Sequence, residues 1–153
     1  MAKWQFEGVD RYIAQLQQLG ADTEEMCGKA IYKGAGLVAD ALRSSINGLT
    51  TDDGYHPPGE MRNGPTTEEK QGLLDGFGIS KMRQDGTMYN VKIGFSGRNP
   101  NGLMNSGVAR QIESGTSWMT KQPFINRTVN SKKRKCEEVM METLDEEIKN
   151  LMQ

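Results

Sequence analysis

The chain has one histidine and two cysteines among its 153 residues, too few for the common protein metal sites. His56 has no second imidazole in the sequence with which to build a zinc cluster. Cys27 and Cys136 stand far apart in two predicted helices, so we expect reduced thiols rather than a disulfide. We predict no cofactor and no enzyme, because the motifs contain no nucleophile–base pair. Carboxylates that folding brings together would escape this reasoning.

Long apolar runs are also missing, and the charge is nearly balanced. No stretch approaches the roughly 18 apolar residues of a membrane helix, and the polar N-terminus does not resemble a signal peptide. We therefore expect no membrane contact and a chain that stays in the cytosol where it is made. The net charge is -1 and the sequence pI is about 5.9. No overall positive field would thus hold nucleic acid.

Apolar residues are scarce as well, at 35% of the chain, with a mean hydropathy of -0.67. This is polar for a compact monomer. The length of 153 residues nevertheless predicts one domain, residues 1–153, with a real core. The 18 glycines gather mainly between positions 48 and 107. Their distribution indicates long loops, at about 49–65 and 97–107, or a large shared interface.

Hydrophobic periodicity predicts the elements at both ends of the chain. Trp4–Phe6 alternates like a short strand, and Asp10–Leu19 has helical spacing. A long helix is expected from Asp22 or Thr23 to Asn47, and a second from Pro123 or Phe124 to about Leu151. Three glycines interrupt the first long helix, and they favour a face over which another element crosses closely (Gly28, Gly34 and Gly36).

The middle of the chain predicts a short helix and a hairpin. Thr66 and Glu69 have the spacing of a capping box, so we expect a helix over Thr67–Leu74 that closes at Gly76. A strand is expected to begin at Phe77 and run to about Met82. Asp85-Gly86 is typical of a type I′ hairpin turn. Alternating apolar residues then predict one continuous second strand (Tyr89, Val91, Ile93 and Phe95).

Segment 110–124, R-Q-I-E-S-G-T-S-W-M-T-K-Q-P-F, predicts a corner in the fold. We expect a strand ending at Gln111–Glu113, a sharp turn at Gly115 and a helix beginning at Pro123. Thr116 and Ser117 have hydroxyls that can hold such a turn. Together the patterns predict an α+β fold, in which a small antiparallel β-sheet of about 3–4 strands with a central hairpin packs against two long α-helices.

The same segment resembles the signature of the tail-completion proteins of the gene-product-ten type, which join head and tail in long-tailed phages. That signature has an apolar residue, Glu, any residue, Gly-Thr, a spacer and Pro-Phe. It falls here on Ile112, Glu113, Gly115, Thr116, Pro123 and Phe124. The spacer departs from the family at Trp118 and Lys121, and the helix start departs at residues 126–128. The predicted order of elements agrees with the family over roughly residues 8–150.

The resemblance implies a structural virion protein at the neck of the tail, assembled in the host cytoplasm. It would form a ring, typically a hexamer, that caps the tail tube and joins it to the head connector, with DNA only as the passing genome. Tail terminator, head-closure adaptor and the ring number all remain open. Because loops on a rigid scaffold commonly contact partners, candidate contact residues are Tyr55, His56, Arg62, Arg98 and Asn99.

A second hypothesis is a small nucleic-acid-binding protein. Lys132, Lys133, Arg134 and Lys135 form one basic cluster that could contact phosphates. The simpler interpretation is a solvated helix turn, because the acidic residues that follow at 137, 138 and 142 lie within pairing distance on a helix. The two hypotheses differ in the salt dependence of DNA binding.

Overall fold

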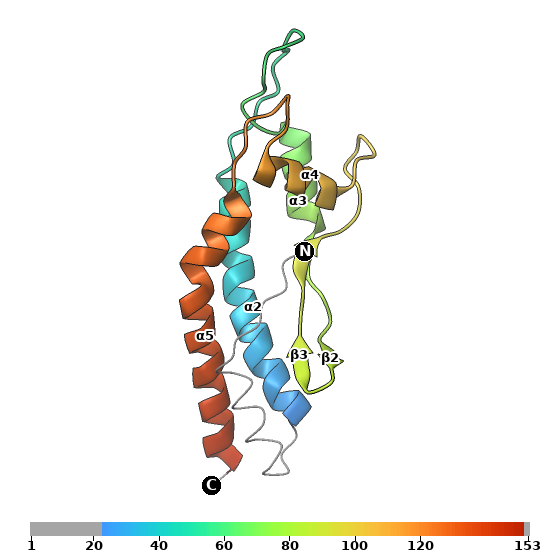
Figure 1. Ribbon diagram of the computed structural model, residues 1–153. Helices are drawn as coiled ribbons and strands as arrows, with labels where there is room; N and C mark the ends of the chain where they lie inside the picture. The colour runs from blue at the N-terminus through green and yellow to red at the C-terminus, as the bar shows by residue number, and fades with distance from the viewer. Residues whose placement is uncertain (1–22, 152–153) are drawn as a thin grey trace.

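The computed structural model describes residues 23–151, and this part of the chain is α+β, as the sequence predicts (Figure 1). It contains four helices and four short strands in the order α2 (Thr23–Asn47), α3 (Thr67–Gly76), β1 (Phe77–Ile79), β2 (Arg83–Asp85), β3 (Met88–Asn90), β4 (Ile93–Phe95), α4 (Asn105–Ser114) and α5 (Phe124–Leu151). The expected strand Trp4–Phe6 and helix Asp10–Leu19 lie outside the described residues.

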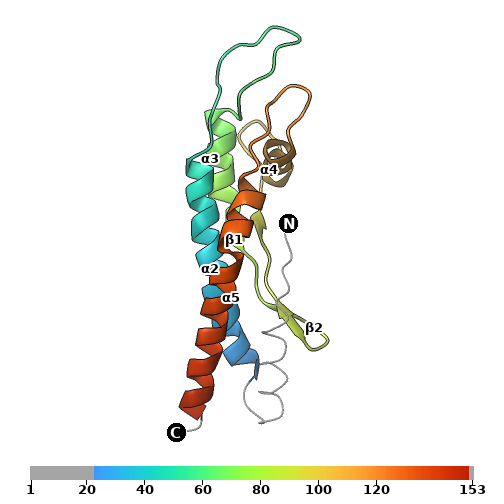
Figure 2. The same cartoon turned by 60° about the vertical axis from the view of Figure 1, so that its left-hand side comes forward.

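The two long helices, α2 and α5, run antiparallel and lie side by side in both views (Figures 1 and 2). Both agree with their predicted bounds. The facing surfaces supply much of the core, through Val38, Leu42 and Ile46 of α2 and Cys136, Met140 and Leu144 of α5. Each fully buried Leu or Ile stabilises the fold by roughly 1.5–3 kcal/mol relative to an exposed side chain. No helix in residues 23–151 has both the length and the apolar character of a membrane span.

A glycine in α2 allows this close packing, as the sequence suggested. A Cβ at Gly34 would stand 2.6 Å from Met140 Cγ and 2.9 Å from Cys136 Sγ of α5. Gly28 faces Met82 at an ordinary 3.7 Å, and Gly36 has nothing within 4 Å. The prediction of a close crossing is therefore confirmed at one position of the three, Gly34.

The hairpin is a bent ribbon rather than two continuous strands, which corrects the prediction of one strand from Tyr89 to Phe95. β1 pairs with β4, and β2 pairs with β3, both antiparallel. Three residues, 80–82, separate β1 from β2, whereas two, 91–92, separate β3 from β4. The extra residue has the character of a β-bulge. Ser80 spans the break, because its backbone N–H donates to Lys92 O and its Oγ accepts from Lys92 N at 2.8 Å.

The turn of this ribbon also differs from the predicted type. Asp85 pairs with Met88, so Gly86 and Thr87 are the two central residues. Gly86 has φ +64°, and no residue other than glycine has positive φ among those described. A type I′ turn needs positive φ at both central positions, so the type I′ prediction is wrong.

Helix α4 occupies residues for which the sequence pattern predicts a loop and a strand. Gln111–Glu113, expected to end a strand, belongs to the last turn of α4. The helix buries Val108, Ala109 and Ile112, a helical spacing that stabilises it against α3 and α5. The predicted strand–loop–helix corner is in fact a helix–loop–helix corner. Gly115 does end the first element in a sharp turn, as expected, with φ +76°.

Candidate functional site at the loop-bearing end

The candidate site lies at the end of the molecule where two loops extend past the helices, uppermost in Figures 1 and 2. We call it the loop-bearing end, and define it by residues 49–65 and 115–122. Both loops connect elements that are packed into the core, so the scaffold below them is fixed. What matters for function is how rigidly the loops are held and what they expose.

Glu113 fixes the direction in which α5 leaves this end. Its carboxylate oxygens accept hydrogen bonds from the backbone N–H groups of Ile125 at 2.7 Å and Asn126 at 3.0 Å. These are among the first N–H groups of α5, which have no partner within the helix. Pro123 precedes the helix and has no side-chain acceptor with which to cap it. Glu113 therefore caps α5 from the end of α4, and its negative charge favours the helix N-terminus.

The remaining motif residues build the loop between these helices. A Cβ at Gly115 would stand 2.9 Å from Lys121 Cβ, so the loop closes on the glycine. Thr116 N–H donates to Met119 O at 3.0 Å, and Thr116 Oγ1 accepts from Trp118 N at 3.2 Å. Phe124 is buried, and its ring lies 6.5 Å from that of Phe95 in β4. The motif residues from Glu113 to Phe124 thus serve one corner of the fold.

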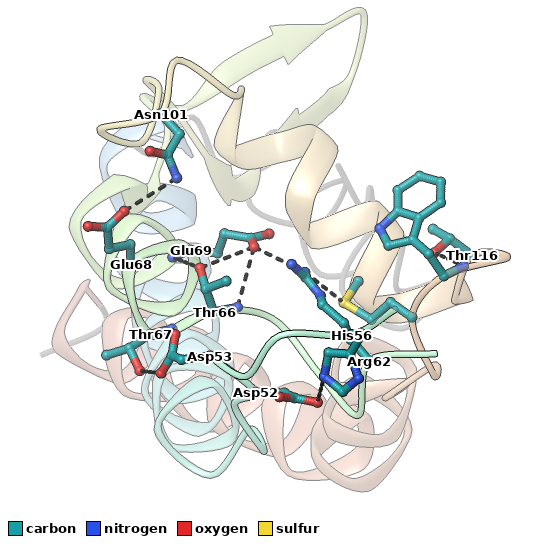
Figure 3. A network of polar contacts seen from close by, with 12 residues as sticks. Asp52, Asp53, His56, Arg62, Thr66, Thr67, Glu68, Glu69, Asn101 and Thr116 are labelled. Carbon is teal, nitrogen blue, oxygen red and sulfur yellow. Dashed lines mark hydrogen bonds and ion pairs between the residues drawn. The ribbon is translucent and has the colours of Figure 1, made fainter. Parts of the chain in front are cut away.

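Arg62 joins the two loops to each other. Its backbone N–H donates to Trp118 O at 2.7 Å, and its carbonyl accepts from Thr120 N at 2.9 Å. Its guanidinium donates to Glu69 Oε1 at 3.1 Å, where the Glu69 side chain is 8% exposed (Figure 3). The same oxygen accepts from Thr66 N, which completes the predicted capping box of α3. Removing one partner from such a buried pair is costly, because the other charge stays behind unpaired.

Gln122 makes a second cross-link below Arg62. Its amide nitrogen donates to Thr50 O at 3.0 Å, and its amide oxygen accepts from Thr50 N at 3.0 Å. Gly64 allows this approach, because a Cβ there would stand 1.9 Å from Thr50 O. The start and the end of the 49–65 loop are therefore both fastened to the corner that Glu113 and Gly115 form.

Two aspartates hold the loop from within (Figure 3). Asp52 Oδ2 accepts from Asn63 N at 2.9 Å, and Asp52 Oδ1 accepts from Gly54 N at 3.1 Å. His56 Nε2 lies 2.8 Å from Asp52 Oδ2. The Asn63 hydrogen bond, followed by those of His56 and Gly54, lowers the Asp52 pKa to about 2. Asp53 accepts from Thr67 N at 2.8 Å and caps α3, and hydrogen bonds from Thr67 lower its pKa.

This framework leaves three large apolar side chains in solvent. Tyr55 is 87% exposed, Met61 47% and Trp118 50%. Of the residues predicted to contact partners, Tyr55 is thus open to solvent, while His56 and Arg62 hold the loop in place. Trp118, at a departure from the family pattern, belongs to the same framework, because its carbonyl accepts from the N–H of Arg62, the residue after Met61.

The second predicted contact loop is held by a buried asparagine. Asn99 is 5% exposed, and its Oδ1 accepts from Asn101 N and Leu103 N, each at 3.0 Å. Arg98 is exposed and donates to Gly102 O at 2.8 Å. The loop is shorter than expected, because α4 already begins at Asn105. The side chains that it exposes are Leu103 and Met104, which the analysis missed, although two adjacent apolar residues in a glycine-rich loop were a readable signal.

The basic cluster is solvent-exposed along one turn of α5. Lys132, Lys133, Arg134 and Lys135 are all exposed. Arg134 lies 3.6 Å from Glu138, four residues on, and its side chain is 93% exposed. This pair agrees with the simpler interpretation of a solvated helix turn. The cluster lies on the shaft of α5 and is not part of the loop-bearing end.

The remaining chemistry-bearing side chains form no further cluster in the part of the chain that the structure describes. No group of three His, Cys, Asp or Glu side chains between residues 23 and 151 could hold a metal ion. Cys27 and Cys136 are free and buried, and burial raises the pKa of each thiol to about 11. No family model, curated protein or solved structure matches this chain.

Proposed function

We propose that this chain is a ring-forming structural subunit, which completes the tail of a tailed phage at the junction between tail and head. The loop-bearing end would contact the tail tube or the head connector, and copies of the chain would surround the passing DNA. The protein would belong to the neck of the virion and assemble in the host cytoplasm. The proposal starts from the resemblance of residues 112–124 to the tail-completion signature.

The observation that carries the proposal is that the motif residues together build the corner to which the 49–65 loop is attached. Glu113 and Gly115 shape the α4–α5 corner, and Arg62 and Gln122 fasten the 49–65 loop to that corner. The motif thus supports a rigid end that presents Tyr55, Met61 and Trp118 to solvent. Exposed aromatic and methionine side chains on a fixed framework are typical anchors of protein interfaces.

The first test is the mass of the purified protein in solution by light scattering, with negative-stain images of the same fractions. We expect rings, or a monomer that forms rings when tail-tube protein is added. A protein that stays monomeric with both tube and connector proteins would contradict the proposal. The double variant Tyr55→Ser/Trp118→Ser should lose tube or connector binding, whereas Thr87→Ser at the hairpin turn serves as the matched control.

The alternative function is binding of nucleic acid through the basic turn of α5. Its support is the exposure of all four cationic side chains at residues 132–135. This reading predicts DNA affinity that falls steeply as salt rises, with a slope that decreases when Lys132 and Lys133 are replaced by Gln. Affinity that is absent at low salt would remove this alternative.

A further inference from the structure

Leu103 and Met104 form an exposed apolar pair that the fold presents at a fixed place. Leu103 is 50% exposed and Met104 is 54% exposed. Their loop extends beside the N-terminal end of α4 (Figure 1). The loop is held by Asn99, whose Oδ1 accepts from Leu103 N–H. At the base of the loop, Asn105 is 3% exposed, and its Nδ2 donates to Ser96 O at 2.9 Å. The two apolar side chains are therefore held out from a rigid loop, which lowers the entropy lost when they are buried in a contact.

An apolar pocket opens beside α4, and Ser106, Arg110, Glu113 and Ser114 of that helix are part of its lining. Its volume is about 260 Å³, and its walls are side chains of α2, β1, β4 and α5 (Leu42, Phe77, Ile93, Phe95 and Ile125). This is smaller than the roughly 300–1,000 Å³ of most small-molecule sites. It suits one or two apolar side chains of a protein partner, the arrangement that carries most of the energy of many interfaces.

The charges around the pair and around the pocket are complementary. Arg110 lies on the rim of the pocket and is exposed, with no ion pair found for it among the described residues. Glu68 of α3 contacts the loop that carries the pair, because it accepts a hydrogen bond from Asn101 Nδ2 at 3.3 Å, and it is otherwise open to solvent. The opposite match also exists, because Arg98 lies next to the pair and Glu113 lies on the rim.

We infer that Leu103 and Met104 of one copy of this chain insert into the pocket of a second copy. Glu68 of the first copy then meets Arg110 of the second, and Arg98 approaches Glu113. The pair and the pocket are different patches, so the contact can close reciprocally between two copies or, as the proposed ring requires, run from each copy to the next, which gives its own pair to another neighbour. A contact of this heterologous kind forms a ring when the rotation between copies closes. The inference rests on the proposed ring and names the surfaces that build it.

Mixed cross-linking tests the contact directly. One preparation carries Met104→Cys on the exposed pair, the other carries Ser114→Cys on the pocket rim, and a short bis-maleimide is added to the mixture. The native cysteines give no background, because both are 1% exposed with a thiol pKa of about 11. We expect a two-chain product that needs both variants. Thr87→Cys at the exposed hairpin turn, used in place of Met104→Cys, is the matched control.

A second measurement tests the same contact without new cysteines. The double variant Leu103→Ser/Met104→Ser should raise the protein concentration needed for assembly about tenfold or more. Both side chains are half in solvent, so far-ultraviolet circular dichroism and the unfolding midpoint should stay those of the parent. Arg110→Glu should weaken assembly as well, and Glu68→Arg added to it should restore part of the loss.

The outcomes separate this inference from the proposed ring. Rings without the mixed product, or with the double variant assembling normally, would overturn the contact and leave the ring intact. A mixed product in particles of only two copies would support the contact and refute the ring. If Met104→Cys alone gave the cross-linked two-chain product in the same yield as the mixture, the pairing of the exposed pair with the pocket would be overturned. A protein that stays monomeric at all concentrations would refute both.

Discussion

Replacing Glu113 by Ala should destabilise the whole fold, although the residue lies in no hydrophobic cluster. The carboxylate accepts from Ile125 N at 2.7 Å and Asn126 N at 3.0 Å, and it thereby caps a helix of 28 residues. Pro123, just before the helix, cannot take over this role. In Glu113→Ala both N–H groups lose a charged acceptor and depend on water alone.

The size of the loss follows from these two hydrogen bonds. Removing a capping side chain costs about 0.5–2 kcal/mol, and a hydrogen bond to a charged group contributes about 1.5–3 kcal/mol. Glu113 is half-buried, so water replaces part of the interaction. We expect about 2 kcal/mol for Glu113→Ala, which corresponds to a fall in Tm of roughly 4–8 °C for a chain of this size. Glu113→Gln keeps one oxygen acceptor and should lose about half as much.

Urea and thermal unfolding, followed by circular dichroism, measure the effect. Glu142→Ala is the matched control, because Glu142 is an exposed glutamate on the shaft of the same helix. Its stability should stay within about 0.5 kcal/mol of the parent. If Glu113→Ala and Glu142→Ala were equally stable, the capping role would be refuted, and with it our explanation of this motif position.

Three further predictions concern the packing, the loop and the thiols. Gly34→Ala should lower the free energy of unfolding, measured in urea, by about 1–3 kcal/mol through overpacking against Met140. Gly36→Ala, with nothing within 4 Å of the added Cβ, should raise it by about 0.5–1 kcal/mol. Equal effects of the two substitutions would contradict the close crossing. The Asp52 pKa is lowered to about 2, so the stabilising contribution of its carboxylate is present above about pH 4 and is lost as the pH falls towards 2. Asp52→Asn should flatten the dependence of Tm on pH between about pH 4 and pH 2. An unchanged slope would refute the assignment of this pH dependence to Asp52. Both native thiols should react with a disulfide reagent at pH 8 only as fast as the protein unfolds; immediate reaction would show that they are accessible.

The long helices could be predicted because their signals are local. The spacing of buried residues in α2, the acidic first turn and the Thr66–Glu69 capping box are all contained within a few turns of sequence. The α+β class followed from the same patterns. Even Gly34 could be interpreted correctly, because a glycine inside an apolar stripe indicates a close neighbour.

The secondary-structure predictions were wrong where a short run of residues fitted both the two-residue period of a strand and the roughly 3.6-residue period of a helix. Gln111–Glu113 alternates over three residues like a strand, but Val108, Ala109 and Ile112 repeat at helical spacing, and Gly115 ends the helix. A longer window would have favoured the helix. In the hairpin the alternation from Tyr89 to Phe95 is real, and it cannot reveal the extra residue at 80–82 on the partner strand. Such a bulge is a property of the pair and not of either strand.

The framework of the loop-bearing end could not be predicted, because its contacts join distant positions. Arg62 reaches Trp118 and Thr120, and Gln122 reaches Thr50, across more than fifty residues of sequence. A polar segment with no periodicity gives no sign of such partners. The sequence therefore indicated loops available for contacts, while the structure shows which of their residues hold the framework and which are exposed.

The separation of framework residues from exposed residues determines how the 49–65 loop would bind a partner. A loop of this length is expected either to be mobile or to serve a partner. Here Arg62, Gln122 and Asp52 hold its ends and its middle by backbone hydrogen bonds. A segment that is ordered before binding loses less conformational entropy in a complex, so more of the contact energy appears as affinity. Removing the Arg62 side chain keeps these backbone hydrogen bonds but breaks its ion pair with Glu69, which ties the loop to α3. It should therefore weaken partner binding even though Tyr55 and Trp118 remain, because a loop with one link fewer has more conformational entropy to lose in a complex.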